Sequence, residues 1–263
     1  MLPIRTLSLY VIIGYAKQKP ESSFLRPHAP FFQNLVKLLV DMMSLLSENE
    51  SWNKGGNLEQ DYYEEDKEEL ARIAFESLES LSLTVRGNIA TILFENSVMQ
   101  AMKSSENWKE RHAALSSILA TKKNWLDSLQ DNLDNVVNIS LHFCNDRKVR
   151  VRWCAILLIG TLLESAPMLP ERFHHRFLPV ILTEMKDDAN PTIQSVSAEA
   201  TSGFCHGAAP DLIRPYLEDL MNNIIHHLRT KHEDLISKAL LATADIAKRT
   251  KSEFIPVCSY CNC

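Results

Sequence analysis

The chain has 263 residues, of which 45% are hydrophobic and only 7 are glycine, and its formal net charge is −5. It is long enough to bury a sizeable core, and it lacks the sustained alternation of apolar and polar residues that half-buried strands require. A net acidic chain is also a poor match for nucleic acid, because neutralisation of phosphates by a basic domain supplies most of that affinity. Composition therefore favours an all-α protein that does not bind nucleic acid directly.

The N-terminal run from Leu7 to Tyr15 is apolar and follows Arg5, like the core of a short signal peptide. No small-residue cleavage site follows it, and no segment reaches the 18 apolar residues of a membrane span. We therefore predict that this run belongs to the first helix of a helical pair, and we expect no membrane partner.

Apolar residues at helical spacing predict five pairs of helices and one final helix. The predicted pairs span Ile4–Leu46, Lys67–Lys103, Asn107–Asn145, Lys148–Lys186 and Pro191–Leu228, and the final helix spans Glu233–Arg249. Within the pairs, Pro167 and Pro210 are expected to end one helix and open the next, since proline is tolerated only in the first turn. An apolar stripe predicts the buried face of the helix from Asp211: Ile213, Leu217, Leu220, Ile224 and Leu228.

The opening helices of these pairs repeat one pattern at a nearly constant interval. Arg111, Arg152, Gln194 and Ser237 hold equivalent positions, at separations of 41, 42 and 43 residues. A period of about 40 to 47 residues is typical of HEAT repeats. We predict a HEAT-repeat α-solenoid, a right-handed superhelix of antiparallel helix pairs. It would form a single array of about five and a half repeats over residues 1–263, with an atypical tail at 252–263.

Small and cationic residues in the opening helices suggest how neighbouring repeats meet. Alanines would allow close approach of the helices: Ala113, Ala114, Ala155, Ala198, Ala200 and Ala239. Arg150 and Arg152 share the register of Arg111, so we expect a structural role in which they pair with acids or helix-terminal carbonyls of the adjacent repeat. The alternative is that these arginines bind phosphate groups directly.

Four stretches occur in the same order as in a known superfamily. They read ENWKERHAAL, NDRKVRVRWCAILLIGTLLESAP, FHHRFLPVILTEMKDDANPTIQSVSAEATSGF and PDLIRPYLEDLMNNIIHHL, and an acidic insert precedes them at residues 48–69. Together they resemble the importin beta (karyopherin beta) superfamily, most closely nuclear import receptors of the importin five type. Receptors of this superfamily are several times longer, so we expect the chain to be an internal block of one.

The resemblance implies a non-enzymatic receptor that binds basic localisation signals of cargo proteins and shuttles between cytoplasm and nucleus through the nuclear pore. It implies two other partners, phenylalanine-glycine nucleoporins and Ran GTPase. The principal Ran contact of the superfamily rests on N-terminal repeats outside this resemblance. The alternative is a HEAT-repeat scaffold or regulatory subunit of another class.

Two acidic regions are candidates for contact with basic cargo. The insert at 48–69 holds nine acids against two lysines, and its candidate residues are Glu48, Glu50, Trp52, Glu59, Asp61, Glu64, Glu65 and Asp66. It would attract basic partners at long range, or else be only a solvated loop. The second helices, which line the concave face in receptors of this superfamily, carry acids and amides that could bind lysine and arginine: Asp131, Asp134, Asn135, Asn138, Glu184, Glu218, Asp219, Asn222 and Asn223.

The sequence shows no sign of catalytic or metal chemistry. We find no nucleophile elbow, phosphate-binding glycine loop or zinc-peptidase motif, and expect no cofactor. Cys258, Cys261 and Cys263 form C-x-x-C-x-C. Because structural zinc usually takes four ligands and no second C-x-x-C occurs, we predict no metal site.

Overall fold

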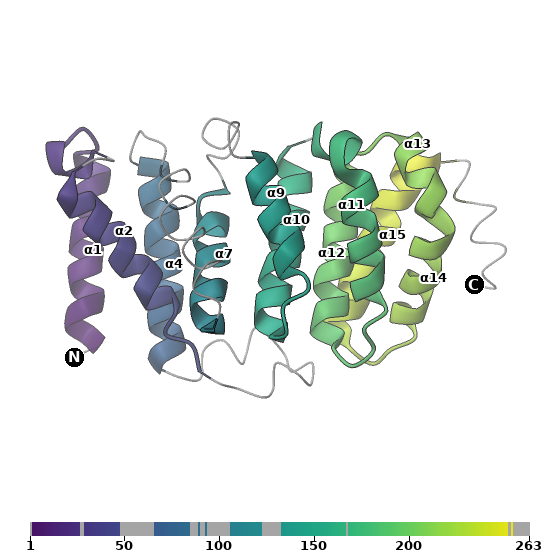
Figure 1. Cartoon of the computed structure of the whole chain (residues 1–263), viewed down its shortest axis with the longest axis horizontal. Coiled ribbons are helices and arrows are strands. Elements are labelled where there is room, and N and C mark those ends of the chain that lie inside the picture. The colour runs from purple at the N-terminus through teal and green to yellow at the C-terminus, as the bar shows by residue number, and fades with distance from the viewer. Residues whose placement is uncertain are drawn as a thin grey trace. The chain divides into compact units, whose positions relative to one another are not determined.

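The computed structural model describes residues 2–26, 29–47, 66–84, 106–122, 133–166 and 168–251, together with positions 89, 93 and 254. These residues form helices and turns, as Figure 1 shows, and none of them lies in a strand. They fall into two compact units, one ending at Val137 and the other beginning at Asn138. The predicted count of five and a half repeats stays a prediction.

The described residues of the first unit form four complete helices and the start of a fifth. They are α1 (Leu2–Gln18), α2 (Pro30–Met43), α4 (Asp66–Thr84), α7 (Trp108–Ala120) and the beginning of α9 (Leu133–Phe143). Helix α4 packs against both α1 and α2, and α7 packs against α2 and α4. Fully buried side chains such as Phe32 and Leu78 form the core of this unit.

Helix α7 begins where local chemistry predicts. Asn107 precedes it, and the side-chain oxygen of Asn107 accepts a hydrogen bond from the backbone N–H of Lys109 at 3.1 Å. Such a cap satisfies one of the amide groups that a helix leaves unpaired in its first turn. The Lys109 ammonium donates to the carbonyl of Leu46 at 2.6 Å, which ties the start of α7 to the segment after α2.

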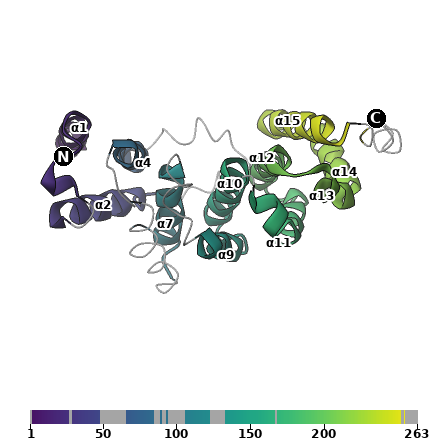
Figure 2. The ribbon, with the colours of Figure 1, turned by 90° about the horizontal axis from the view of Figure 1, so that it is seen from above.

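The second unit consists of two layers of helices. One layer holds α10 (Val149–Ser165), α12 (Pro191–Gly207) and α15 (Glu233–Thr250), and the other holds α11 (Met168–Met185) and α14 (Leu217–Leu228). Figure 2 shows the two layers edge-on. Short α13 (Pro210–Ile213) and a 3-10 turn at Arg214–Tyr216 lead into α14.

The layer of α10, α12 and α15 is the more closely packed. Helix α12 makes far more contact with α10 and α15 than α11 makes with α14. The six alanines predicted to allow close approach are buried. Gly160 and Gly203 allow an even closer approach than the alanines do. A Cβ on Gly203 would stand 2.6 Å from the carbonyl oxygen of Gly160. The backbones of α10 and α12 therefore touch directly.

Candidate functional site

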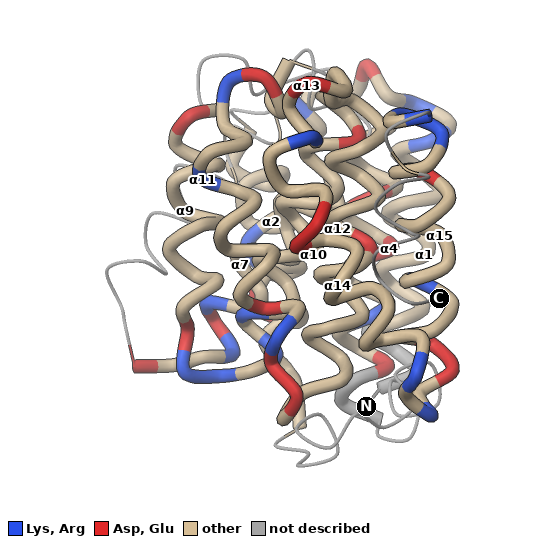
Figure 3. Tube along the Cα trace, turned by 90° about the vertical axis from the view of Figure 1, so that its right-hand side faces the viewer, with Lys and Arg blue, Asp and Glu red and all other residues tan. Residues whose placement is uncertain are grey.

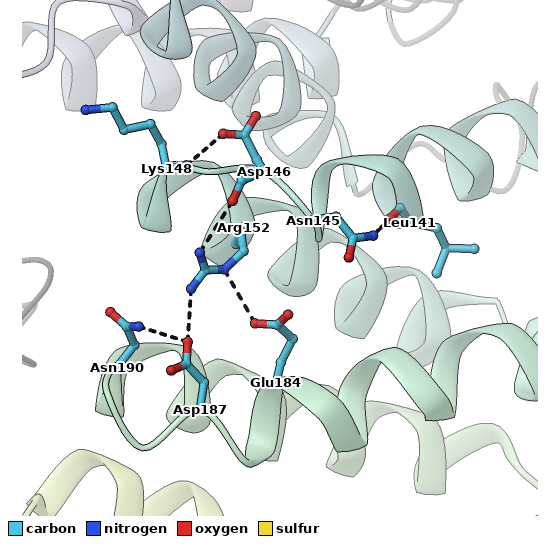
Figure 4. Close-up of polar contacts among 8 residues, drawn as sticks. All are labelled: Leu141, Asn145, Asp146, Lys148, Arg152, Glu184, Asp187 and Asn190. Atoms are coloured by element: carbon cyan, nitrogen blue, oxygen red, sulfur yellow. Dashed lines mark hydrogen bonds and ion pairs between the residues drawn. The ribbon is translucent and has the colours of Figure 1, made fainter.

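Arg152, near the start of α10, is held by an acid at the end of α11 and by an acid in the turn between α11 and α12 (Figure 4). Its Nη2 lies 3.0 Å from Oδ2 of Asp187, and its Nε lies 3.5 Å from Oε2 of Glu184. Its Nη1 donates to the carbonyl of Asp146 at 3.4 Å. Because the Arg152 side chain is only 17% exposed and its guanidinium already has partners, it is poorly placed to bind an external phosphate.

The acids around Arg152 belong to a wider network. The side chain of Asn190 donates to Asp187 at 2.8 Å, and the Asp146 carboxylate accepts from the backbone N–H of Lys148 at 2.8 Å. Burial raises the pKa of Glu184, and the neighbouring Arg152 guanidinium acts in the opposite direction. The network joins the loops that lead into α10 and α12. Arg111 and Arg150, the other two predicted structural arginines, are both buried.

A second network lies at the end of α11. Gln194, in the register of Arg152, donates to the carbonyl of Met185 at 3.2 Å and to the Asp188 carboxylate at 2.9 Å. The same carbonyl lies 2.8 Å from Nε2 of the buried His227 on α14. Hydrogen bonds from His226 and Gln194 lower the pKa of Asp188, whereas burial lowers the pKa of His227. These bonds fasten α14 to the turn between α11 and α12.

The predicted cargo residues on α9 and α11 do not form one uniform acidic surface. Asp134 and Asn135 are exposed on α9. The side-chain oxygen of Asn138 accepts a hydrogen bond from Arg176 of α11 at 2.8 Å. Glu184 is only 13% exposed and faces Arg152. Asn138 and Glu184 therefore already have partners within the protein.

Helix α14 presents Glu218, Asp219 and Asn222 at the surface. Asn223 is buried, and its side-chain nitrogen donates to the carbonyl of Asp219 at 2.9 Å. It therefore acts within its own helix. Asp131 and the insert residues Glu48, Glu50, Trp52, Glu59, Asp61, Glu64 and Glu65 lie outside the described residues, and Asp66 is described only as the first residue of α4.

Acidic and basic residues are interleaved in the described part of the second unit. Helix α11 exposes Arg172, His175 and Arg176. It packs against α14, which exposes acids. Figure 3 marks both Lys or Arg and Asp or Glu near the ends of the helices.

In the described part of the second unit, α10, α12 and α15 pack more closely than α11 and α14 do. The expectation that second helices line the concave face stays a prediction.

A pocket of about 170 Å³ opens on the closely packed layer, between α10, α12 and α15. Gly160, Ala200 and Gly203 are part of its lining, where the helix backbones meet. Glu164 and Glu199 bring carboxylates to it, and Lys238 brings an ammonium group. The sequence did not single out this site. In the sequence, the lining residues share one feature, which is that they lie at helical spacing along the opening helices.

The described residues contain no group of three or more His, Cys, Asp and Glu side chains arranged to hold a metal ion. None of the described helices is both long enough and apolar enough to cross a membrane. Three cysteines, Cys144, Cys154 and Cys205, are buried free thiols. The predicted C-x-x-C-x-C tail lies outside the described residues.

The chain is similar to known proteins over nearly its whole length. A family model described as "Importin subunit beta-1-like, TPR repeats" matches residues 21–261. Importin subunit beta-3 of Saccharomyces cerevisiae is 24% identical over 255 residues, which cover 96% of this chain and 23% of that protein.

Solved structures of Kap121p confirm the predicted α-solenoid fold. Kap121p bound to RanGTP has a TM-score of 0.83 at 23% identity, covering 98% of this chain and 25% of that one. Kap121p bound to Pho4p has a TM-score of 0.82 at 23% identity, with the same coverage. The chain thus spans about a quarter of the length of these relatives. Because the family model matches most of its residues, the chain belongs to the importin subunit beta-1-like family with TPR repeats.

Proposed function

We propose that the chain is part of a nuclear transport receptor and that it binds cargo segments rich in lysine and arginine. The observation that carries the proposal is the family match over residues 21–261. Among the relatives, Kap121p has been solved with Pho4p, with the SUMO protease Ulp1p and with the extreme C-terminus of the phosphatase Cdc14p. By this proposal the chain is a binding protein and carries out no catalysis.

The same reasoning extends the proposal to the partners and location of the receptor. Kap121p has been solved bound to RanGTP and bound to Nup53p. We therefore propose Ran GTPase and nucleoporins with phenylalanine-glycine repeats as partners of the receptor to which this chain belongs. Such a receptor shuttles between cytoplasm and nucleus through the nuclear pore.

The exposed acids of the chain support the choice of a basic ligand. Glu218 and Asp219 are exposed on α14, and Asp134 is exposed on α9. Carboxylates pair with lysine and arginine, and neighbouring amides such as Asn135 and Asn222 can hydrogen-bond a peptide backbone. The acids of the insert at 48–69 would act at longer range, by raising the rate of encounter.

A pair of peptides tests this proposal. The first is lysine-rich, and the second has the same sequence with every lysine acetylated, which removes the charge while keeping the length. We expect fluorescence anisotropy to show binding of the first peptide only, with an affinity that falls steeply as salt is raised, since exposed charges are screened. Equal binding of the two peptides, or an affinity that does not change with salt, would contradict the proposal.

The alternative is a HEAT-repeat scaffold or regulatory subunit of another class, in which the acidic insert plays no part. Replacing the acids between 48 and 65 by their amides keeps the chain length and leaves α4 intact, because α4 begins at Asp66. A receptor should then bind the lysine-rich peptide more slowly. A scaffold should retain its protein partner and show no change in association rate.

A further inference from the structure

In the described part of the second unit, three turns lie at one end of the helices. They are residues 144–148 before α10, residues 186–190 before α12 and residues 229–232 before α15. In Figure 1 these connections lie at the lower ends of the helices. Arg152 contacts Asp146 in the first turn and Asp187 in the second. His226, near the end of α14, contacts Asp188 in the second turn. Successive turns therefore lie side by side, and we call the three together the turn edge.

The turn edge exposes cations from each of its turns. The exposed lysines and arginines are Arg147, Lys148, Lys186, Arg229 and Lys231. Figure 4 shows the Lys148 side chain extending away from Arg152. Against these five cations the edge holds three acids, whereas the whole chain has a net charge of −5. The edge therefore differs in sign from the chain as a whole.

The three acids of the turn edge have partners within the protein. Asp187 pairs with Arg152, and Asp188 accepts a hydrogen bond from the side chain of Gln194. The carboxylate of Asp146 accepts one from a backbone N–H of its own turn. By contrast, four of the five exposed cations form no ion pair with another described residue. The charge that the edge offers to a partner is therefore mainly positive.

The spacing of the turns suits an extended acidic segment. Carboxylates form charge-assisted hydrogen bonds with lysine and arginine. Neighbouring helices pack about 8–10 Å apart, and an extended chain advances about 3.3 Å per residue. A segment with an acid at about every third residue would thus bring one carboxylate to each turn.

Nucleic acid fits the turn edge less well. The three turns contain no Phe, Tyr or Trp on which bases could stack. Two exposed acids, Asp188 within the edge and Glu233 directly after it, interrupt the positive charge that a continuous phosphate backbone would follow. A peptide can carry its carboxylates at intervals, so it avoids these acids.

We propose that the turn edge binds an acidic segment of a partner protein, with one carboxylate at each of the three turns. This surface takes a ligand of the opposite charge to the basic cargo proposed above. Its residues are also different from the exposed acids of α9 and α14. The two proposals can therefore hold or fail independently.

The test uses the full chain and a fluorescent peptide of about ten residues, with glutamate at every third position and glycine or serine between. The control peptide has glutamine in place of each glutamate. We expect anisotropy to show binding of the acidic peptide only, with an affinity that falls as salt is raised. A peptide of the same composition with its glutamates in one run should bind more weakly.

Two double variants locate the site. Lys186→Gln with Arg229→Gln removes one exposed cation from each of two turns, and we expect it to weaken binding of the acidic peptide about fourfold or more. Arg172→Gln with Lys248→Gln is the matched control, because it removes two charges from exposed positions at the opposite ends of α11 and α15. It should weaken binding by less than about twofold.

A third double variant, Lys186→Arg with Arg229→Lys, keeps both charges and should bind the acidic peptide as the wild type does. Thermal melts of every variant separate lost binding from lost folding. Equal losses in the edge and control variants, or equal binding of the glutamate and glutamine peptides, would overturn the proposal. An oligothymidylate of similar length tests the other occupant. If it binds more tightly than the acidic peptide and only the edge variant weakens it, the edge belongs to nucleic acid and the proposal is wrong.

Discussion

The carbonyl oxygen of Gly160 lies 2.6 Å from the point where a Cβ on Gly203 would stand. A Cβ on Gly160 would in turn stand 2.9 Å from the Cα of Ala200. Both contacts are with backbone atoms, which cannot rotate away as a side chain can. Helices α10 and α12 therefore hold their separation only while both positions remain glycine, and the pocket above them depends on that separation.

Gly203→Ala should destabilise the protein by about 1–3 kcal/mol, the usual cost of overpacking, although alanine is the better helix former. Gly14→Ala is the matched control, because Gly14 lies inside α1 and a Cβ there meets nothing within 4 Å. It should raise stability by up to about 1 kcal/mol. Urea unfolding followed by circular dichroism measures both changes. An unchanged or increased stability of Gly203→Ala would show that α10 and α12 can separate freely.

Arg152→Met should lower the free energy of unfolding by about 2 kcal/mol, because it leaves the largely buried Glu184 carboxylate without its cation. The cost is below that of a fully buried pair, since both side chains keep some contact with solvent. In a double-mutant cycle, adding Glu184→Gln to Arg152→Met should recover part of the lost stability, because the effects of residues in contact are not additive. Additive losses would mean that the two side chains do not interact.

The comparison for Arg152 is the exposed ion pair between Arg72 and Glu76 on α4, at 2.6 Å and one helical turn apart. Glu76 is 53% exposed, so Glu76→Gln should change the free energy of unfolding by less than about 0.5 kcal/mol. Similar losses at the two sites would indicate that the burial of Arg152 and Glu184 does not strengthen their contribution to stability.

The buried cysteines should react slowly with alkylating reagents. Burial raises the pKa of Cys205 to about 12, and it also raises the pKa of Cys144. The reactive species is the thiolate, which both groups would form only rarely near neutral pH. We expect labelling of Cys144 and Cys205 to be more than about tenfold slower in the native protein than in urea, measured peptide by peptide by mass spectrometry. Equal rates would mean that their helices open frequently.

Local sequence signals predicted the helices well. The predicted start at Pro191 is the observed start of α12, and the predicted start at Lys148 precedes α10 by one residue. These boundaries follow from proline and capping chemistry within a few residues. The helix predicted from Asp211 is instead interrupted by a 3-10 turn around Pro215, which lacks an N–H. Its apolar stripe is still largely buried.

Contacts between repeats could not be predicted in the same way. The register of Arg152 indicated a partner in the adjacent repeat, but Asp187 lies 35 residues further along the chain and nothing local selects it. Glu184 was predicted to be a cargo-binding residue at the surface of its helix, yet its carboxylate pairs with Arg152 of α10. The pocket residues Glu199 and Lys238 lie 39 residues apart, and only the stacking of α12 on α15 brings them together.

His227 should make stability depend on pH. An unfolded histidine titrates near pH 6.5, and burial lowers the pKa of His227 in the folded protein. Between these two values the unfolded chain binds more protons, so stability falls as pH drops below about 6.5. His227→Gln can still donate to the Met185 carbonyl but does not titrate, and it should flatten the difference in urea midpoint between about pH 5 and about pH 7.5. His175→Gln, at an exposed position of α11, should leave that difference as in the wild type. If both variants keep the wild-type difference, other groups cause the pH dependence.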